Sequence, residues 1–136
     1  NPDYTIDVAT LAGACFVALG NEASGLMGND RFLIEALKKS GDATYERVWE
    51  FPMYDEYADL IISDFADVKN VISNATGPSG AGAITAAKFL ENFVAGKRAH
   101  IDIAGTDWSD ADKGYKPKGA TGVGVRLLTH FLSALQ

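Results

Sequence analysis

Cysteine is almost absent from this sequence, since Cys15 is the only one among its 136 residues. A single thiol excludes a disulfide framework, and it excludes the C-x-x-C spacing that holds structural zinc. Long apolar runs are absent as well, because none approaches the ~20 consecutive residues that a membrane-spanning helix needs. Together these absences favour a reducing, cytoplasmic location and predict no membrane partner.

Clusters of basic residues are a third absence. The chain holds 12 Lys and Arg residues against 18 Asp and Glu residues, which gives a formal net charge of −6 at pH 7. The Lys and Arg residues are also scattered along the sequence, whereas a protein that binds nucleic acid needs a clustered basic face. The sequence therefore predicts no nucleic-acid partner.

The composition that remains is typical of a folded domain. Hydrophobic residues make up 47% of the chain and charged residues 22%, close to the average for globular proteins, so disorder is not indicated. The length is that of one domain and is large enough to bury a core.

A stretch of small and apolar residues at 80–94 predicts the central helix of the chain. Ser79 is suited to cap its N-terminus, and Gly96 is suited to follow its end. An early glycine such as Gly82 costs about 1 kcal/mol of helix stability relative to Ala, which is expected where another backbone must come very close. Residues 99–104 then alternate apolar with polar, which predicts a strand. A helix followed by a strand is typical of an α/β fold, whose ligands bind where such strands end.

The rest of the chain shows further elements. The pattern predicts strands at residues 4–10, 15–19 and 24–28, a helix at 31–39, an extended segment at 45–51, and helices at 53–62 and 121–135. Asn29 or Asp30 is expected to cap the helix that begins at residue 31. The apolar residues of the last helix that are expected to face the core are Val125, Leu128, Phe131 and Leu132.

Two segments leave more than one interpretation open. Residues 15–19 are a run of five apolar residues, which fits a buried strand better than a helix, although periodicity alone does not distinguish the two. Residues 106–119 form a long polar stretch, and a loop of that length is usually functional or part of an interface.

Few residues of this chain are suited to catalysis. It has two histidines, His100 and His130, and neither has a partner at metal-ligand spacing. The H-E-x-x-H and G-x-S-x-G motifs are both absent. His100 lies on the predicted strand, where a structural role is favoured over a catalytic one by roughly four to one. Asp64 and Asp67, or Asp107, Asp110 and Asp112, could bind a cation, although solvated loop acids are the commoner case. The residues therefore predict no complete catalytic set in this chain.

Six segments of the chain together resemble one known family. They are, in order, TLAGA at residues 10–14 after an IDVA strand, RVWEFP at 47–52, SDFADVKN at 63–70, AGAITAAKFL at 81–90, HIDIAG at 100–105 and DKGYKPKGATGVGVR at 112–126. The set is similar to the leucyl aminopeptidase family, the cytosolic two-metal peptidases, over essentially all 136 residues. Each segment alone is a weak signal, but six in register make a chance similarity improbable.

The resemblance implies a fold and an assembly. Residues 1–136 would be the C-terminal portion of that family's catalytic domain, a partial domain of the three-layer α/β/α fold with a mixed sheet. The family removes N-terminal residues such as Leu from peptides, and it forms hexamers whose active sites face an internal cavity. The implied partners are the missing N-terminal part of the same enzyme, a peptide substrate and further copies in a homo-hexamer.

The resemblance also implies where the chemistry lies. In that family two divalent metal ions, zinc or manganese, are held by segments resembling VGKG, FDSGG and NTDAEGR, and none of these occurs here. This chain is therefore expected to hold no metal and to be inactive alone.

The resemblance implies that this chain supplies two parts of the wall of the substrate pocket. Thr10, Leu11 and Gly13 match the loop that contacts the substrate backbone. Val71 and Ala104 match positions that line the apolar pocket for the first side chain. The alternative is a non-catalytic piece, either an assembly module or an inactive crystallised fragment.

The missing ligand segments lead to a first prediction. The isolated chain of 136 residues is expected to bind no catalytic metal tightly and to hydrolyse no leucyl substrate, because a two-metal site needs several fixed carboxylates. Calorimetric titration with manganese or zinc, together with a leucyl-anilide assay, tests this. Micromolar binding accompanied by turnover would contradict it.

Overall fold

The computed structural model describes residues 2–72 and 80–135. The elements along the chain are β1 (Thr5–Ala9), α1 (Gly13–Leu19), β2 (Ser24–Gly28), α2 (Arg31–Thr44), β3 (Val48–Glu50), the 3-10 helix η1 (Asp55–Ile61), α3 (Gly82–Glu91), β4 (Arg98–Asp102), β5 (Trp108–Ser109), β6 (Gly119–Ala120) and α4 (Val125–Ala134). None of the described helices has the length and apolar character that crossing a membrane requires.

Four of the strands form a mixed sheet in the order β1-β4-β2-β3. β4 runs parallel to β1 and antiparallel to β2, and β2 runs parallel to β3. The register places Ala9 beside Asp102 and Met27 beside His100. β4 is therefore an interior strand that packs between two neighbours.

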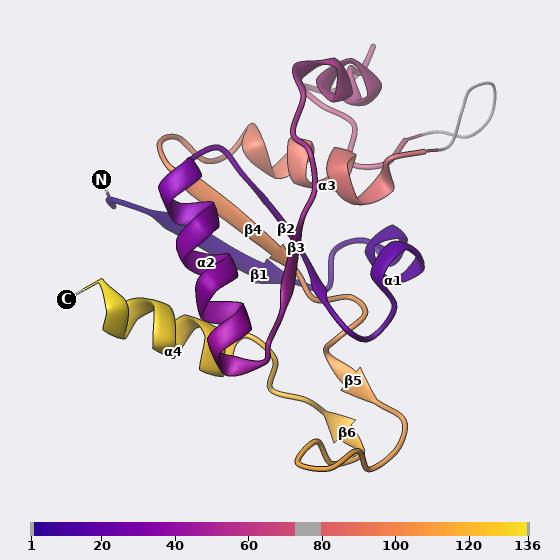
Figure 1. Ribbon diagram of the computed structural model, residues 1–136. Helices are drawn as coiled ribbons and strands as arrows, with labels where there is room; N and C mark the ends of the chain where they lie inside the picture. Colours follow the sequence, from indigo (N-terminus) through magenta and orange to yellow (C-terminus); the bar gives the residue numbers. More distant parts are fainter. Residues whose placement is uncertain (1, 73–79, 136) are drawn as a thin grey trace.

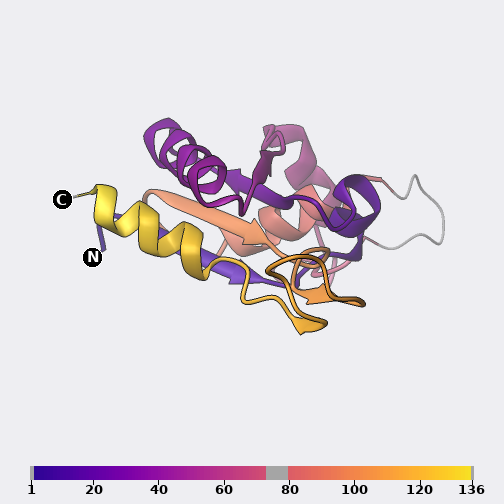
Figure 2. The same cartoon turned by 60° about the horizontal axis from the view of Figure 1, so that its bottom comes forward.

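Helices cover both faces of this sheet, which makes three layers (Figures 1 and 2). α2 and α4 pack together on one face, where the core gathers around Leu26, Leu37, Ile101 and Phe131. α1 and α3 lie on the opposite face, where both contact β2. The expected fold class, an α/β/α arrangement with a mixed sheet, is confirmed.

β4 is buried along its whole length, and its two faces differ in chemistry. Successive side chains of a strand point to opposite faces. Ala99 and Ile101 therefore join the apolar core under α2 and α4. Arg98, His100 and Asp102 point to the other face, and each is no more than 1% exposed. Because a buried ionisable group needs a partner, the elements on that face are arranged around these three side chains.

The predicted strand at residues 15–19 is wrong, because this segment belongs to α1. Only Cys15 of this run is buried, while Phe16 is 47% and Val17 84% exposed. The run was read as strand because its apolar side chains were expected to be buried. Most of them lie outside the core of the described chain.

The helix predicted at residues 31–39 is confirmed, and it continues five residues further than predicted. Asp30 caps it as expected, since its Oδ1 accepts the backbone N–H of Leu33 at 2.9 Å. The helix then passes Gly41 and ends at Thr44, where Tyr45 adopts the left-handed conformation. A Cβ at Gly41 would lie 2.8 Å from the carbonyl oxygen of Glu46, so this glycine serves close packing rather than helix termination.

The helix expected at residues 80–94 is shorter at both ends, since α3 spans Gly82–Glu91. Ala81 is its N-cap residue, in the left-handed conformation and without a side-chain hydrogen bond, while the expected cap Ser79 lies outside the described residues. Gly96 lies five residues beyond the end of α3 with a φ of 86°. A close approach is found at Gly82, but it is made by a side chain and not by the backbone that was expected, because a Cβ there would lie 2.9 Å from the Cβ of Ala14 in α1.

Three further expectations are corrected in detail. In α4 the buried residues are Leu127 and Phe131, whereas Val125 is 67% and Leu132 59% exposed, so the inward face is rotated from the predicted one. The helix expected at residues 53–62 is the 3-10 helix η1. The loop at residues 106–119 contains β5 and the start of a two-stranded pairing with β6.

Replacing Gly82 with Leu is expected to lower the free energy of unfolding of the intact protein by about 1–3 kcal/mol, because the new side chain would overpack the contact with α1. The matched control is Gly80→Leu. Gly80 is exposed, and no atom of residues 2–72 and 80–135 lies within 4 Å of a Cβ placed there, so this variant should change stability little. Thermal unfolding of both variants checks the prediction, and an unchanged melting temperature for Gly82→Leu would count against it.

Candidate functional site

The carboxyl ends of β1 and β4 lie side by side, and the chain leaves the sheet there in two neighbouring segments. The N–H of Ile103 donates to the carbonyl oxygen of Ala9 at 2.9 Å, which extends the parallel pairing by one bond. Thr10 follows β1 directly, and Ala104 lies two residues beyond β4. Two of the residues predicted from the resemblance therefore lie at one sheet edge, the edge where open α/β sheets bind ligands.

The side chain of Asp102 connects these two segments. Its Oδ1 accepts the N–H of Leu11 at 3.2 Å and the N–H of Ala104 at 3.1 Å, and its Oδ2 accepts the N–H of Ala12 at 3.0 Å. Asp102 is 0% exposed. A single buried carboxylate thus holds the backbone of both segments in place.

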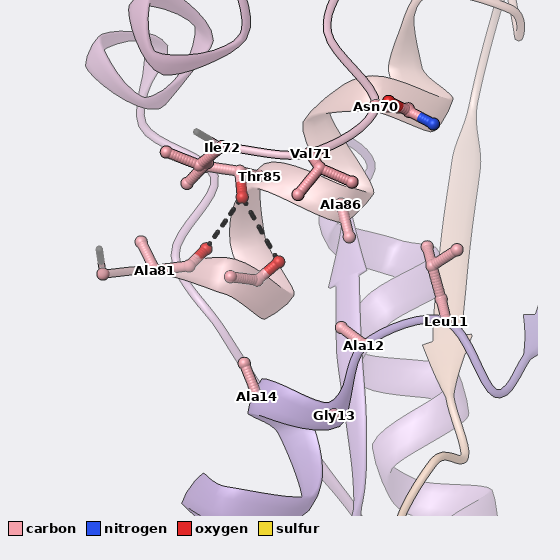
Figure 3. A pocket seen from close by; sticks show the side chains of 12 residues that line it. Leu11, Ala12, Gly13, Ala14, Asn70, Val71, Ile72, Ala81, Thr85 and Ala86 are labelled. Atoms are coloured by element: carbon pink, nitrogen blue, oxygen red, sulfur yellow. Dashed lines mark hydrogen bonds between the residues drawn. The ribbon is translucent and has the colours of Figure 1, made fainter. Parts of the chain in front are cut away.

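A cavity of about 380 Å³ lies beside the segment that follows β1. Its walls come from residues 11–14, from residues 70–72 and from the N-terminal part of α3 (Figure 3). Leu11, Gly13 and Val71 all line it, so three of the five residues predicted to bind substrate meet around one space. Thr10 and Ala104 are not among its lining residues.

The walls of this cavity are mostly apolar and small. Most of the lining residues are alanine, glycine or a larger aliphatic residue. The hydroxyl of Thr85 faces the carbonyl oxygens of Ala81 and Gly82, each at 3.2 Å (Figure 3). Because this hydroxyl is engaged with its own helix, the cavity is suited to an apolar group rather than to a charged one.

α3 is attached to the sheet by a group of charges in which Arg98 and Lys88 are buried and Glu91 is partly exposed. Arg98 Nη2 lies 3.1 Å from Glu91 Oε1, and Lys88 Nζ lies 2.9 Å from Glu91 Oε2. Burial raises the pKa of the Glu91 carboxyl, but the neighbouring Lys88 and Arg98 cations outweigh it and hold that pKa below its usual range. Glu91 therefore stays ionised at neutral pH and bridges the two cations.

His100 lies on the same face of β4 and has two acidic neighbours. Its Nδ1 is 2.5 Å from Asp7 Oδ1, and its Nε2 is 4.0 Å from Asp102 Oδ2. The ring is 0% exposed, which agrees with the structural role favoured for it. Spacing along the sequence missed the partner because Asp7 is 93 residues away.

The described residues do not fit the metal pair that the resemblance implies. Within residues 2–72 and 80–135, no group of three or more His, Cys, Asp or Glu side chains could hold a metal ion. The nearest approach to such a group is Asp7, His100 and Asp102. Both carboxylate oxygens of Asp102 already accept backbone N–H groups, so a cation there would compete with these hydrogen bonds.

Asp102 is the site residue that sequence reasoning missed. The alternation at residues 99–104 placed it on one strand face with His100, which was the only available signal. Its partners are backbone N–H groups 90 and 91 residues earlier in the chain. Backbone groups leave no trace in the sequence, so this contact is visible only in the folded protein.

A mixed sheet covered by helices, with an apolar cavity beside its carboxyl edge, defines an α/β domain with a candidate site for a small apolar group. Residues 1–129 match the model of the cytosol aminopeptidase family, catalytic domain. Because this match spans most of the chain, the protein belongs to the cytosol aminopeptidase family. The resemblance inferred from the six sequence segments is confirmed.

Individual relatives agree with this assignment. The chain is 56% identical over 134 residues to a protein of Geobacter sulfurreducens, 54% over 136 residues to one of Chlorobaculum parvum, and 50% over 133 residues to one of Nitrosomonas europaea. All three are named "Probable cytosol aminopeptidase". These matches cover 97–98% of this chain but 25–26% of each relative, so the chain spans about a quarter of their length.

The thiol of Cys15 gives a prediction for this region. Burial, followed by the negative charge of Asp102, raises the pKa of Cys15 to about 11, and its side chain is 1% exposed. Since the thiolate is the reactive form, Cys15 of the native intact protein should resist iodoacetamide at pH 8 and should react after unfolding. Peptide mass spectrometry of native and denatured samples measures this. Rapid modification of the native protein would show that α1 opens.

Proposed function

We propose that this chain is the substrate-binding side of an aminopeptidase that releases N-terminal amino acids, such as Leu, from peptides. The observation that carries the proposal is the cavity of about 380 Å³ lined by Leu11, Gly13 and Val71, in a chain that belongs to the cytosol aminopeptidase family. In this proposal the chain is the C-terminal portion of the catalytic domain.

Two parts of the chain are proposed to have different roles in binding a peptide, and of their residues Leu11, Gly13 and Val71 line the cavity whereas Ala104 lies outside its lining. The segment at residues 10–13 presents backbone groups beside the cavity, and these are suited to align the backbone of the substrate. Val71 and Ala104 are proposed to contact the first side chain of the peptide. The small, apolar walls favour an aliphatic side chain, because burial of each CH₂ contributes about 0.8 kcal/mol.

We propose that the intact enzyme uses two divalent metal ions, zinc or manganese. The described residues of this chain do not hold them, so their ligands would come from the rest of the enzyme. The role of this chain is then to bind and orient the peptide, and no proton transfer is assigned to its own residues.

The remaining partners follow from the same proposal. Large apolar side chains are exposed in the described chain, among them Phe65 at 100% and Val17 at 84%. Such exposure supports burial against the rest of the enzyme or against other subunits of a homo-hexamer. The relatives' name supports a cytosolic location.

The same exposed side chains favour the alternative function, a non-catalytic assembly module. The intact protein distinguishes the two. Purified with manganese or zinc, it is expected to hydrolyse leucyl anilide. A fully assembled, metal-loaded protein that cleaves neither leucyl nor alanyl anilide would favour the assembly module.

Enlarging Ala104 tests the pocket assignment. In the intact enzyme Ala104→Leu should fill the space for the first side chain, and a difference of one methylene already changes discrimination by about 1–3 kcal/mol. We expect kcat/KM for leucyl anilide to fall at least about tenfold, with a much smaller effect on alanyl anilide.

The matched control for this prediction is Ala18→Leu, since Ala18 is exposed on α1 and is not among the residues proposed to bind the peptide. It should leave both substrates unaffected. If Ala104→Leu lowers activity on both substrates equally, Ala104 is a packing residue and does not contact the first side chain.

A further inference from the structure

We propose that Asp102 is the positioning residue of the substrate pocket, which it organises through backbone N–H groups without touching the substrate. The inference rests on the proposed function, because it assigns a role to the two segments that are proposed to bind the peptide. It concerns a residue to which the resemblance assigned no role and which is not among the residues that line the cavity.

The carboxylate of Asp102 accepts hydrogen bonds from two segments, the one after β1 and the one after β4. Two N–H groups from the segment after β1, those of Leu11 and Ala12, point at the carboxylate from one side, at 3.2 and 3.0 Å. The N–H of Ala104 reaches it at 3.1 Å from the other segment. The proposed backbone-binding segment and the proposed side-chain pocket therefore depend on the same two oxygen atoms.

These three N–H groups have few other partners. The ladder between β1 and β4 ends where Ala9 accepts from Ile103, so residues 11 and 12 lie beyond the reach of the sheet. The helix that follows, α1, begins at Gly13 without a side-chain cap. Asp102 takes the place of the ladder for the N–H groups of Leu11 and Ala12, and thereby sets the orientation of the peptide groups at residues 10–12.

Only a carboxylate satisfies all three donors. Ionised Asp accepts at both oxygens and donates nothing, so Oδ1 can take two N–H groups and Oδ2 one. An Asn side chain has nearly the same shape but carries an NH₂ group in place of one oxygen. Whichever way the amide turns, its N–H groups then face at least one of the backbone N–H groups of Leu11, Ala12 and Ala104.

The position of the Asp102 carboxylate is fixed by its burial and by its neighbours on the sheet. The residue lies at the end of an interior strand and is 0% exposed. Its carbonyl oxygen accepts from the Sγ of Cys15 at 3.6 Å, and His100, held by Asp7, lies 4.0 Å from its Oδ2. Asp102 therefore cannot follow the two segments if they shift, and this makes it a fixed reference for the pocket.

The chain offers a matched control in Glu46. This is a second buried carboxylate that accepts two backbone N–H groups, those of Gly124 and Leu127, each at 2.9 Å. It also pairs with Arg126 Nε at 3.0 Å, and it caps the N-terminus of α4. Glu46 does not line the cavity of about 380 Å³, so its loss should affect stability alone.

The experiment compares Asp102→Asn and Glu46→Gln in the intact, metal-loaded enzyme. kcat and KM are measured on the folded fraction with leucyl anilide and with alanyl anilide. For Asp102→Asn we expect kcat/KM for the leucyl substrate to fall about tenfold to a hundredfold, because small misplacements of substrate have effects of this size. The ratio of leucyl to alanyl kcat/KM should fall by about threefold or more, since the side-chain pocket is displaced as well. Glu46→Gln should lower the melting temperature and leave both kinetic values within about twofold of the wild type.

Several results would overturn the proposal. It is wrong if Asp102→Asn keeps the wild-type kcat/KM and the wild-type substrate ratio, or if both variants lose activity in the same proportion for both substrates. A wild-type enzyme that cleaves neither anilide refutes the proposed function itself. An active wild type together with an Asp102→Asn variant of unchanged kinetics refutes only the role of Asp102.

If Asp102→Asn does not fold, a measurement on the wild-type enzyme still tests the proposal. Hydrogen exchange of the substrate-free wild type reports on the amides of Leu11, Ala12 and Ala104 directly. These amides should exchange at least about tenfold more slowly than unprotected backbone, because the carboxylate holds them before substrate arrives. Exchange at the unprotected rate would show that the segments are ordered only by substrate, and the proposal would fail.

Discussion

The burial of three ionisable side chains on one face of β4 constrains the rest of this structure. Arg98, His100 and Asp102 are each no more than 1% exposed, and a buried charge without a neighbour of opposite sign would destabilise the fold. Each has its neighbour on a different element, and Arg98 is paired by charge alone, since its buried nitrogens make no hydrogen bond within the described residues. α3 supplies Glu91, β1 supplies Asp7, and the segment after β1 supplies backbone N–H groups.

The candidate site follows from the same constraint. The cavity lies between residues 11–14 and the start of α3, and both walls are attached to β4 through its charged face. Gly82 and Ala14 let α1 and α3 approach closely enough to form one continuous boundary. The residues that stabilise the fold are therefore also the residues that shape the space for a ligand, which explains why no separate polar cluster is needed there.

Much of the local structure could be predicted from the sequence, and the failures have a common cause. The strands β1, β2 and β4 and the cap at Asp30 depend on neighbouring residues, whose alternation and side-chain chemistry are visible in the chain. α1 was predicted as a strand because five apolar residues were expected to be buried. Exposure is decided by distant elements, and here they leave Val17 at the surface.

The sequence by itself determined the alternation of strands and helices, the family, and three residues that meet around the cavity: Leu11, Gly13 and Val71. These depend on residue types and their spacing. Only the tertiary structure decided that Asp102 joins the two segments at the sheet edge, because its partners are backbone N–H groups about 90 residues away. Every residue except proline carries such an N–H group, so no pattern of side chains can reveal which of them a buried carboxylate will bind.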